Sequence, residues 1–281
     1  MSPLLATVFF GLMASASWGI GDFTGGMASK RLGAISVVAV SHLTGLLLLP
    51  LIALLLHEPL PALRDVLVGA VAGLCGTTGL VALYRALSSG RMGIAAPVSS
   101  VVSAALPLLF SLTLGDVPGV FQAIGFVCGL ASVWLVGQEA GATREHSGLG
   151  MAIIAGIGFS GFLIGLDQIE STAIFWPLIA ARTTSTIMIV AIVLLSRRSL
   201  RADTPITLLA MLTSGVLDVV ADVAFILATR NGELGVASVL SALYPAVTIL
   251  LAWTFLREHI TRWQGVGISL ALVAVALISI G

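Results

Sequence analysis

Two carboxylates lie deep inside one apolar stretch of this sequence. Asp218 and Asp222 are four residues apart within residues 206–228, so on a helix both side chains project from the same face. At 1.5 Å per residue, Asp218 is roughly 18 Å from the start of the stretch, close to the middle of a bilayer. An ionisable group at that depth must face water, find a partner or hold a proton. We interpret the pair as a coupling or substrate-binding site, with a structural ion pair to Arg182 as the alternative.

Arg182 and Asp22 are two further charged residues inside apolar stretches. Arg182 lies within residues 173–195, where it can bind a solute carboxylate through paired hydrogen bonds or neutralise the two aspartates. Asp22 lies in the glycine-rich run 19–26, where glycines let a second helix approach or let the helix break. Asp22 is a candidate for solute contact, with a gate or an interfacial hydrogen bond at the helix end as the alternative.

Uncharged polar and aromatic residues complete the candidate set. Prolines and hydroxyls recur in residues 94–114 and 236–256, and we expect both stretches to be interrupted helices beside a binding site. The alternatives are close packing for the serines, hydrogen-bonded structure for the lone histidine and interfacial anchoring for the aromatic residues. The candidates are Ser99, Ser100, Ser241, Tyr244, Trp18, Tyr84 and His42.

The chain contains an internal repeat. A shift of 142 residues places residues 86–135 on 228–277 without a gap and superposes a Gly-x-x-Gly spacing, a serine and a glutamine. The matched pairs include Gly90 and Gly232, Gly93 and Gly235, Ser99 and Ser241, Gln122 and Gln264, and Gly125 and Gly267. The same shift places Asp218 on Gly76 and Asp222 on Leu80. The repeat predicts two similar halves, and we expect selectivity and coupling to reside in the charges confined to one copy.

The composition indicates an all-α membrane protein. Hydrophobic residues make up 58% of the chain and charged residues only 9%, against about 25% charged residues in a soluble domain. The 13 basic and 13 acidic residues cancel, which leaves no field to attract nucleic acid. Ten stretches have the length and apolar character of membrane-spanning helices and lack the alternation of barrel strands. They are residues 4–28, 34–56, 66–87, 94–114, 120–136, 149–166, 173–195, 206–228, 236–256 and 263–280.

A polar break divides the ten stretches into five and five. We predict two five-helix repeats, residues 1–138 and 148–281, joined by a linker at 139–147. Because five is odd, the second repeat enters the membrane from the opposite face, which gives two inverted repeats around a central cavity. Basic residues gather in the odd-numbered loops, so the positive-inside rule places those loops in the cytoplasm and both termini outside.

Several motifs resemble a transporter family. The second copy reads Leu-Ser-Ala-Leu-Tyr-Pro-Ala-Val at 240–247, Leu-Arg-Glu-His-Ile-Thr at 256–261 and then Gln264-Gly265; the first carries Pro97, Ser99, Ser100, Pro107, Leu114-Gly115-Asp116 and Gln122-Ala123-Ile124-Gly125, after Trp18-Gly19 in an opening helix. This order resembles the EamA-like branch of the drug/metabolite transporter superfamily over nearly the whole chain. The resemblance implies two five-helix domains around a cavity, secondary transport of small metabolites, amino acids or drugs, and cytoplasmic termini. The loop charges indicate the opposite sidedness, so sidedness stays open.

We therefore expect a secondary active transporter of small organic solutes in the cell (inner) membrane, an exporter or exchanger working by alternating access, with protons as candidate coupling ion. Its expected partners are the solute and the lipid bilayer, with a homodimer left open, and no cofactor, metal or nucleic acid is expected. One alternative is an intramembrane aspartyl protease, because Gly19-Ile20-Gly21-Asp22 matches its Gly-x-Gly-Asp string. That chemistry requires two carboxyls sharing a proton. The other is a lipid-handling or scaffolding protein, which would have a laterally open or dry centre.

Overall fold

The chain folds as a bundle of helices, and the computed structural model describes residues 2–88, 92–136, 149–195, 202–257 and 259–280. The described residues form helices and no strands, which confirms the all-α prediction. The predicted linker at 139–147 lies outside them. The helices are α1 Pro3–Leu32, α2 Ala34–Leu55, α3 Leu63–Ser88, α4 Met92–Thr113, α5 Val120–Val136, α6 Leu149–Asp167, α7 Phe175–Leu195, α8 Pro205–Asn231, α9 Leu234–Ser241, α10 Tyr244–Leu256 and α11 Arg262–Ile280.

Local sequence fixes several helix ends. The hydroxyls of Ser2 and Thr204 accept hydrogen bonds from the backbone N–H groups of Leu5 and Thr207, and a proline follows each cap at the first helical position. Gly33 separates α1 from α2 with a φ of 83°, a conformation that glycine adopts without steric cost. These caps start the helices where the apolar stretches start.

The predicted interruption occurs in only one of the two expected stretches. The ninth apolar stretch is broken at Ala242 and Leu243 into α9 and α10, and Pro245 lies in the first turn of α10. A proline ring clashes with the carbonyl of the fourth residue before it, so an unbroken helix cannot pass through this position without a kink. In contrast, α4 runs without interruption through Pro97 and Pro107, so the expectation of a break there is wrong.

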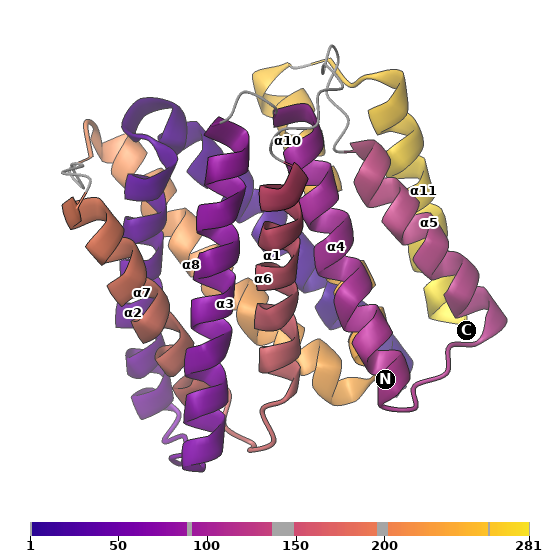
Figure 1. Ribbon diagram of the computed structural model, residues 1–281, viewed down its shortest axis with the longest axis horizontal. Helices are drawn as coiled ribbons and strands as arrows, with labels where there is room; N and C mark the ends of the chain where they lie inside the picture. Colours follow the sequence, from indigo (N-terminus) through magenta and orange to yellow (C-terminus); the bar gives the residue numbers. More distant parts are fainter. Residues whose placement is uncertain (1, 89–91, 137–148, 196–201, 258, 281) are drawn as a thin grey trace.

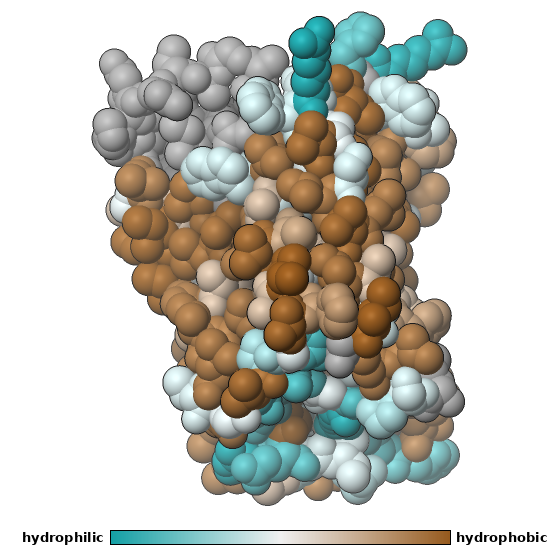
Figure 2. All heavy atoms as spheres, turned by 90° about the vertical axis from the view of Figure 1, so that its right-hand side faces the viewer, coloured by the Kyte–Doolittle hydropathy of each residue, from teal (hydrophilic) through white to brown (hydrophobic). Residues whose placement is uncertain are grey.

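The described helices include eight apolar stretches long enough to cross a membrane, with α9 and α10 counted as one stretch, and two shorter apolar helices at Val98–Thr113 and Val120–Val136. Figure 2 shows a broad band of hydrophobic residues on one side of the bundle, between more polar ends. Exposed side chains of α5 and α11, among them Val127 and Leu272, are 67% and 69% exposed. Apolar exposure on this scale identifies a multi-pass membrane protein with a lipid-facing surface.

The two halves make matching contacts. α1 packs on α8 in the way that α6 packs on α3, and α2 contacts α7. A Cβ atom on Gly125 of α5 would lie 2.7 Å from Ile278 of α11, and one on Gly267 of α11 would lie 2.8 Å from Val136 of α5. Adding 142 to Gly125 and Val136 gives Gly267 and Ile278, so the repeat exchanges one contact for the other. α5 and α11 therefore pack antiparallel, with a glycine at each close approach.

Candidate functional site

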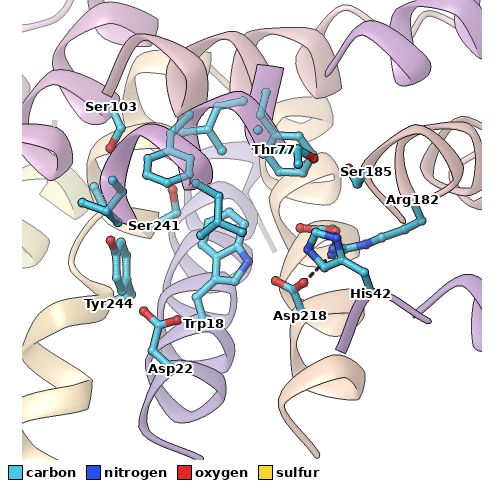
Figure 3. A pocket seen from close by; sticks show the side chains of 18 residues that line it. Trp18, Asp22, His42, Thr77, Ser103, Arg182, Ser185, Asp218, Ser241 and Tyr244 are labelled. Carbon is cyan, nitrogen blue, oxygen red and sulfur yellow. Dashed lines mark hydrogen bonds and ion pairs between the residues drawn. The ribbon is translucent and has the colours of Figure 1, made fainter. Parts of the chain in front are cut away.

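A cavity of about 260 Å³ lies in the interior of the bundle, between helices of both halves. Figure 3 shows its side chains projecting from α1, α3, α7, α8 and the break between α9 and α10. The residues that line it are Trp18, Asp22, His42, Gly76, Thr77, Leu80, Leu83, Ser103, Phe159, Phe162, Leu163, Arg182, Ser185, Asp218, Asp222, Ser241, Ala242 and Tyr244. The helix break thus lies at the cavity wall, as expected for a discontinuous helix beside a binding site.

An ionic cluster forms one wall of the cavity. Nη2 of Arg182 lies 2.7 Å from Oδ2 of Asp218 and 2.5 Å from Oδ2 of Asp222. The side chain of Asp222 is only 2% exposed and that of Arg182 8%, whereas that of Asp218 is 28% exposed. One guanidinium nitrogen therefore holds two carboxylates, and Asp218 is the more accessible of the two. The one-turn spacing on α8 produces this shared contact.

The surroundings of the cluster leave room for it to change. A Cβ atom on Gly45 of α2 would lie 3.5 Å from both Cδ and Nε of Arg182, so the arginine side chain runs close along the backbone of α2. Oδ1 of Asp222 is buried and has no hydrogen-bond partner in the described part of the chain. A buried carboxylate oxygen without a donor is costly, because it has lost water without replacement. The cluster therefore has an unsatisfied acceptor that a proton or a rearranged partner can satisfy.

Asp22 and Tyr244 lie together on the opposite side of the cavity, with Trp18 between them and Asp218 in the view of Figure 3. The Tyr244 hydroxyl lies 3.4 Å from the hydroxyl of Ser100 on α4. The helix break brings Tyr244 to this place, since Tyr244 is the first residue of α10. Asp218 is directed at Arg182 and not at Asp22, so these two carboxyls do not form the paired arrangement that an aspartyl protease requires.

His42 of α2 lies beside Arg182 at the cavity wall (Figure 3). Its Nδ1 atom is buried and lacks a hydrogen-bond partner among the described residues. An imidazole nitrogen without a partner is less common than a hydrogen-bonded one, because burial removes the water that would otherwise satisfy it. This position therefore differs from the hydrogen-bonded structural histidine that the sequence left open.

The structure brings most of the predicted site residues together. Eight of them line the cavity, namely Asp218, Asp222, Arg182, Asp22, Tyr244, Ser241, Trp18 and His42. Ser100 reaches the cavity wall only through Tyr244, and Ser99 is 2% exposed and is not one of the lining residues. Tyr84 belongs to α3, but its side chain lies outside the described part of the structure.

Sequence reasoning missed the apolar and small residues of the cavity. Phe159 and Phe162 of α6 contribute aromatic walls, and Thr77 and Ser185 contribute hydroxyls. The Thr77 hydroxyl donates to the carbonyl of Gly73 in the previous turn, as many intrahelical hydroxyls do. No periodic signal distinguishes such residues from lipid-facing or packing residues, because all four types are common in membrane helices.

Four pairs of equivalent positions face the same cavity. Adding 140 converts the contact of Gly215 with Ser41 and Thr44 into that of Gly73 with Ala181 and Thr184, once α8 and α3 are exchanged by 142. The first two helices of each half are therefore related by 140 residues and the later ones by 142. These shifts pair lining residues as His42 with Arg182, Asp22 with Phe162, Gly76 with Asp218, and Leu80 with Asp222.

A second polar cluster holds the connection between α6 and α7. The Glu58 carboxylate accepts hydrogen bonds from the backbone N–H groups of Ile174, Phe175 and Trp176 at 2.6–3.2 Å, and so caps the start of α7. The indole N–H of Trp176 donates to the Glu58 carbonyl at 3.1 Å. Sequence reasoning missed Glu58, because a carboxylate in a polar loop carries no signal of the helix it caps.

The same connection is also held from α3 and α8. The Asp65 carboxylate accepts from the N–H groups of Glu170 and Ser171, and the Arg230 guanidinium donates to the carbonyls of Ser171, Thr172 and Ala173. At the other end of the bundle, Arg31 lies 3.7 Å from Asp203, with their side chains 57% and 43% exposed. The α6–α7 connection is thus tied firmly to its neighbours, whereas the described ion pair at the other end is loose and exposed.

The fold and the cavity define a multi-pass helical membrane protein with a polar site enclosed between two repeated halves. The EamA-like transporter family matches residues 5–138 and again residues 146–280, so the chain belongs to this family of transporters. A solved structure, titled only as the crystal structure of a protein, is similar with a TM-score of 0.81 and 17% identity, covering 96% of this chain and 97% of that chain. This similarity shows the fold alone. A search of curated proteins gives no match to the chain.

Proposed function

We propose that this protein is a secondary transporter that moves small organic solutes through the central cavity by alternating access, as an exporter or exchanger. The observation that carries the proposal is the cluster of Arg182, Asp218 and Asp222 inside a cavity between the two halves. Ionisable side chains inside a membrane protein are costly to keep and mark ion or substrate pathways. Membership of a transporter family supports the same function.

Protons are the coupling ion in this proposal, and the two carboxylates on Arg182 carry them. Asp218 is the accessible partner and Asp222 the buried one, so a proton arriving from the cavity reaches Asp218 first. Protonation of either carboxyl removes one of the two charges that hold Arg182. The guanidinium then turns to the remaining partner, and the contact between α7 and α8 changes with the proton occupancy.

An inverted relation between the halves would supply the two alternating states. It is supported by the exchanged contacts of α5 and α11 and by the four paired positions in the cavity. In Figure 1, α1 begins at the end of the bundle where α11 finishes, and α6 begins at the opposite end. Rocking one half against the other around a fixed central site is the movement that such repeats allow.

The cluster around the α6–α7 connection supports a closed end in this structure. Solute can pass that end only if the ties of Glu58, Asp65 and Arg230 to residues 170–176 are loosened. We place the protein in the cell (inner) membrane. One chain supplies the whole described lining of the cavity, so a homodimer is not needed to complete the site.

The test is solute flux into proteoliposomes that hold the full chain, measured with and without an imposed pH gradient. We expect the gradient to drive flux in the unchanged protein. Asp218→Asn and Asp222→Asn should bind solute but lose roughly tenfold or more of the gradient-driven flux, because each removes a proton site from the pathway. Asp203→Asn is the matched control, since Asp203 is exposed at the end of the bundle. Equal coupling in all three variants would remove the ionic cluster from the mechanism.

A further inference from the structure

The described part of the cavity wall carries more negative than positive charge. Asp22, Asp218 and Asp222 are its carboxylates, and Arg182 is its guanidinium. With all four ionised and His42 neutral, two negative charges are left without a counter-charge. A cavity of this kind inside a membrane attracts a proton or a cationic solute and repels an anionic one.

Arg182 is not available to bind the carboxylate of a solute. Its Nη2 atom already contacts Asp218 at 2.7 Å and Asp222 at 2.5 Å. A solute carboxylate at the same place would stand beside two aspartates of like charge. The structure therefore favours the neutralising role for Arg182 over the substrate-anchoring role that the sequence left open.

Asp22 is the carboxylate that faces the cavity without an ion pair among the described side chains. It is exposed, lines the cavity and points toward Tyr244, on the opposite side from Arg182 (Figure 3). A carboxylate at membrane depth with no counter-charge is stabilised by a bound cation or a proton. The unpartnered Oδ1 of Asp222, buried on the other wall, adds a second acceptor that the protein alone leaves unsatisfied.

Aromatic rings surround the space next to Asp22. Trp18 and Tyr244 lie beside it, and Phe159 and Phe162 line the cavity from α6. Aromatic faces attract ammonium groups and also pack against an apolar body. The described residues contain no group of three or more histidine, cysteine, aspartate or glutamate side chains that could hold a metal ion. An organic cation fits these walls better than a bare metal ion does.

We propose that the transported solute carries one ammonium group on a compact apolar body, and that Asp22 and Tyr244 bind the ammonium group while Trp18 and Phe162 pack against the body. The cavity volume of about 260 Å³ suits a molecule of that size. This inference rests on the proposed transport function and names the solute class for the same cavity. Asp22 is then a specificity-determining residue, and its equivalent in the other half, Phe162, contributes apolar contact in place of charge.

The experiment compares three probes that share a phenyl ring and differ in the head group: 2-phenylethylamine, 2-phenylethanol and 3-phenylpropionate. Each is added to the purified full chain, and its Kd is obtained from thermal stabilisation and from quenching of tryptophan fluorescence. We expect the amine to bind and the alcohol and the carboxylate to bind at least about tenfold more weakly. The carboxylate binding best, or no probe binding, would overturn the proposal.

Two variants test the role of Asp22. Asp22→Asn should raise the Kd of the amine by roughly tenfold or more, because a buried charge pair loses one partner. Asp22→Glu keeps the charge and should retain most of the affinity, which separates recognition from misfolding. Asp203→Asn is the control and should leave the Kd unchanged. An unchanged Kd in Asp22→Asn would contradict the assignment.

Flux of the same probes separates this inference from the proposed function. If the carboxylate crosses the membrane and the amine does not, the solute class is wrong and transport stands. If the amine binds in an Asp22-dependent way and no probe crosses, recognition stands and the transport function falls.

Discussion

The two halves of this protein share a scaffold and differ in the charge that each brings to the cavity. At the equivalent positions on α3 and α8, the first half has Gly76 and Leu80 and the second has Asp218 and Asp222. At the equivalent positions on α2 and α7, His42 faces Arg182 across the repeat. The ion cluster thus belongs to the second half, although all of these positions line one cavity. Backbone packing follows the repeat, and the chemistry has separated from it.

The fourth helix of each half shows a second difference. α4 is continuous, whereas its counterpart is broken into α9 and α10, and all eight residues of α9 are buried. Ser103 of α4 corresponds to Pro245 of α10 by the shift of 142. The break turns Tyr244 into the cavity and leaves its repeat equivalent, Val102, packed near Gly156. One asymmetric helix therefore gives the cavity its phenolic side chain.

The largest expected effect comes from removing the charge that holds the cluster. Arg182→Ala leaves Asp218 and Asp222 without their shared partner, which should cost about 3–5 kcal/mol and lower the melting temperature by on the order of 10 °C. The repeat equivalent, His42→Ala, should cost roughly 1–2 kcal/mol, since it removes a side chain without an ion pair. Thermal unfolding in detergent, followed by tryptophan fluorescence, measures both.

Equal destabilisation by Arg182→Ala and His42→Ala would contradict the assignment of the ion cluster to the second half. Arg182→Met combined with Asp218→Asn and Asp222→Asn is the control for burial of charge. This triple variant should recover most of the lost stability, because it removes the uncompensated carboxylates together with the arginine.

An intermediate effect is expected from restoring the helix in the second half. Pro245→Ala adds a backbone N–H that can bond to the carbonyl of Ser241, which favours a continuous helix by about 1–3 kcal/mol. The melting temperature should rise, and solute flux should fall by roughly tenfold, because the broken form at the cavity becomes less populated. Flux in proteoliposomes and thermal unfolding measure the two quantities.

Pro107→Ala in α4 is the matched variant for this comparison. α4 is already continuous through Pro107, so this substitution should raise the melting temperature without changing flux. A fall in flux of the same size in both variants would show that the break between α9 and α10 has no special part in transport.

The smallest expected effect concerns Glu233, which precedes α9 and corresponds to Arg91 in the first half. Burial, and then the nearby charge of Asp116, raise the pKa of the Glu233 carboxyl above its ordinary value. A raised folded-state pKa contributes stability below the unfolded pKa that is lost as pH rises through the folded pKa. Glu233→Gln should therefore raise the melting temperature by about 1 °C at pH 8 and leave it unchanged at pH 4.

Asp203→Asn provides a control of opposite sign. A hydrogen bond from Thr207 is the first cause that lowers the pKa of the Asp203 carboxyl, with the charge of Arg31 adding to it. Its contribution is present above the unfolded pKa and is lost as pH falls through the folded pKa. Asp203→Asn should thus lower the melting temperature slightly at pH 8. The same pH dependence in both variants would contradict the environments described for the two carboxyls.

The candidate site could be predicted in part. Asp218, Asp222 and Arg182 were found because a charge inside an apolar stretch is a strong signal, whatever the neighbouring helices are. The shared contact of Asp218 and Asp222 with Arg182 was only one of two alternatives, because sequence does not tell which faces of two helices meet. Phe159 and Phe162 carried no signal, since an aromatic residue facing a cavity resembles one facing lipid.

The amino-acid sequence by itself determined the helices, the repeat, the family and the depth of the charged side chains. These follow from hydrophobic length, spacing and motif, which are properties of a segment and its local order. Only the tertiary structure decided that α4 is continuous and α9–α10 broken, that Arg182 contacts both aspartates, and that Asp22 faces Tyr244 across from them. Those facts depend on how helices distant in sequence rotate and pack against one another, and a periodic pattern within one helix leaves that rotation undetermined.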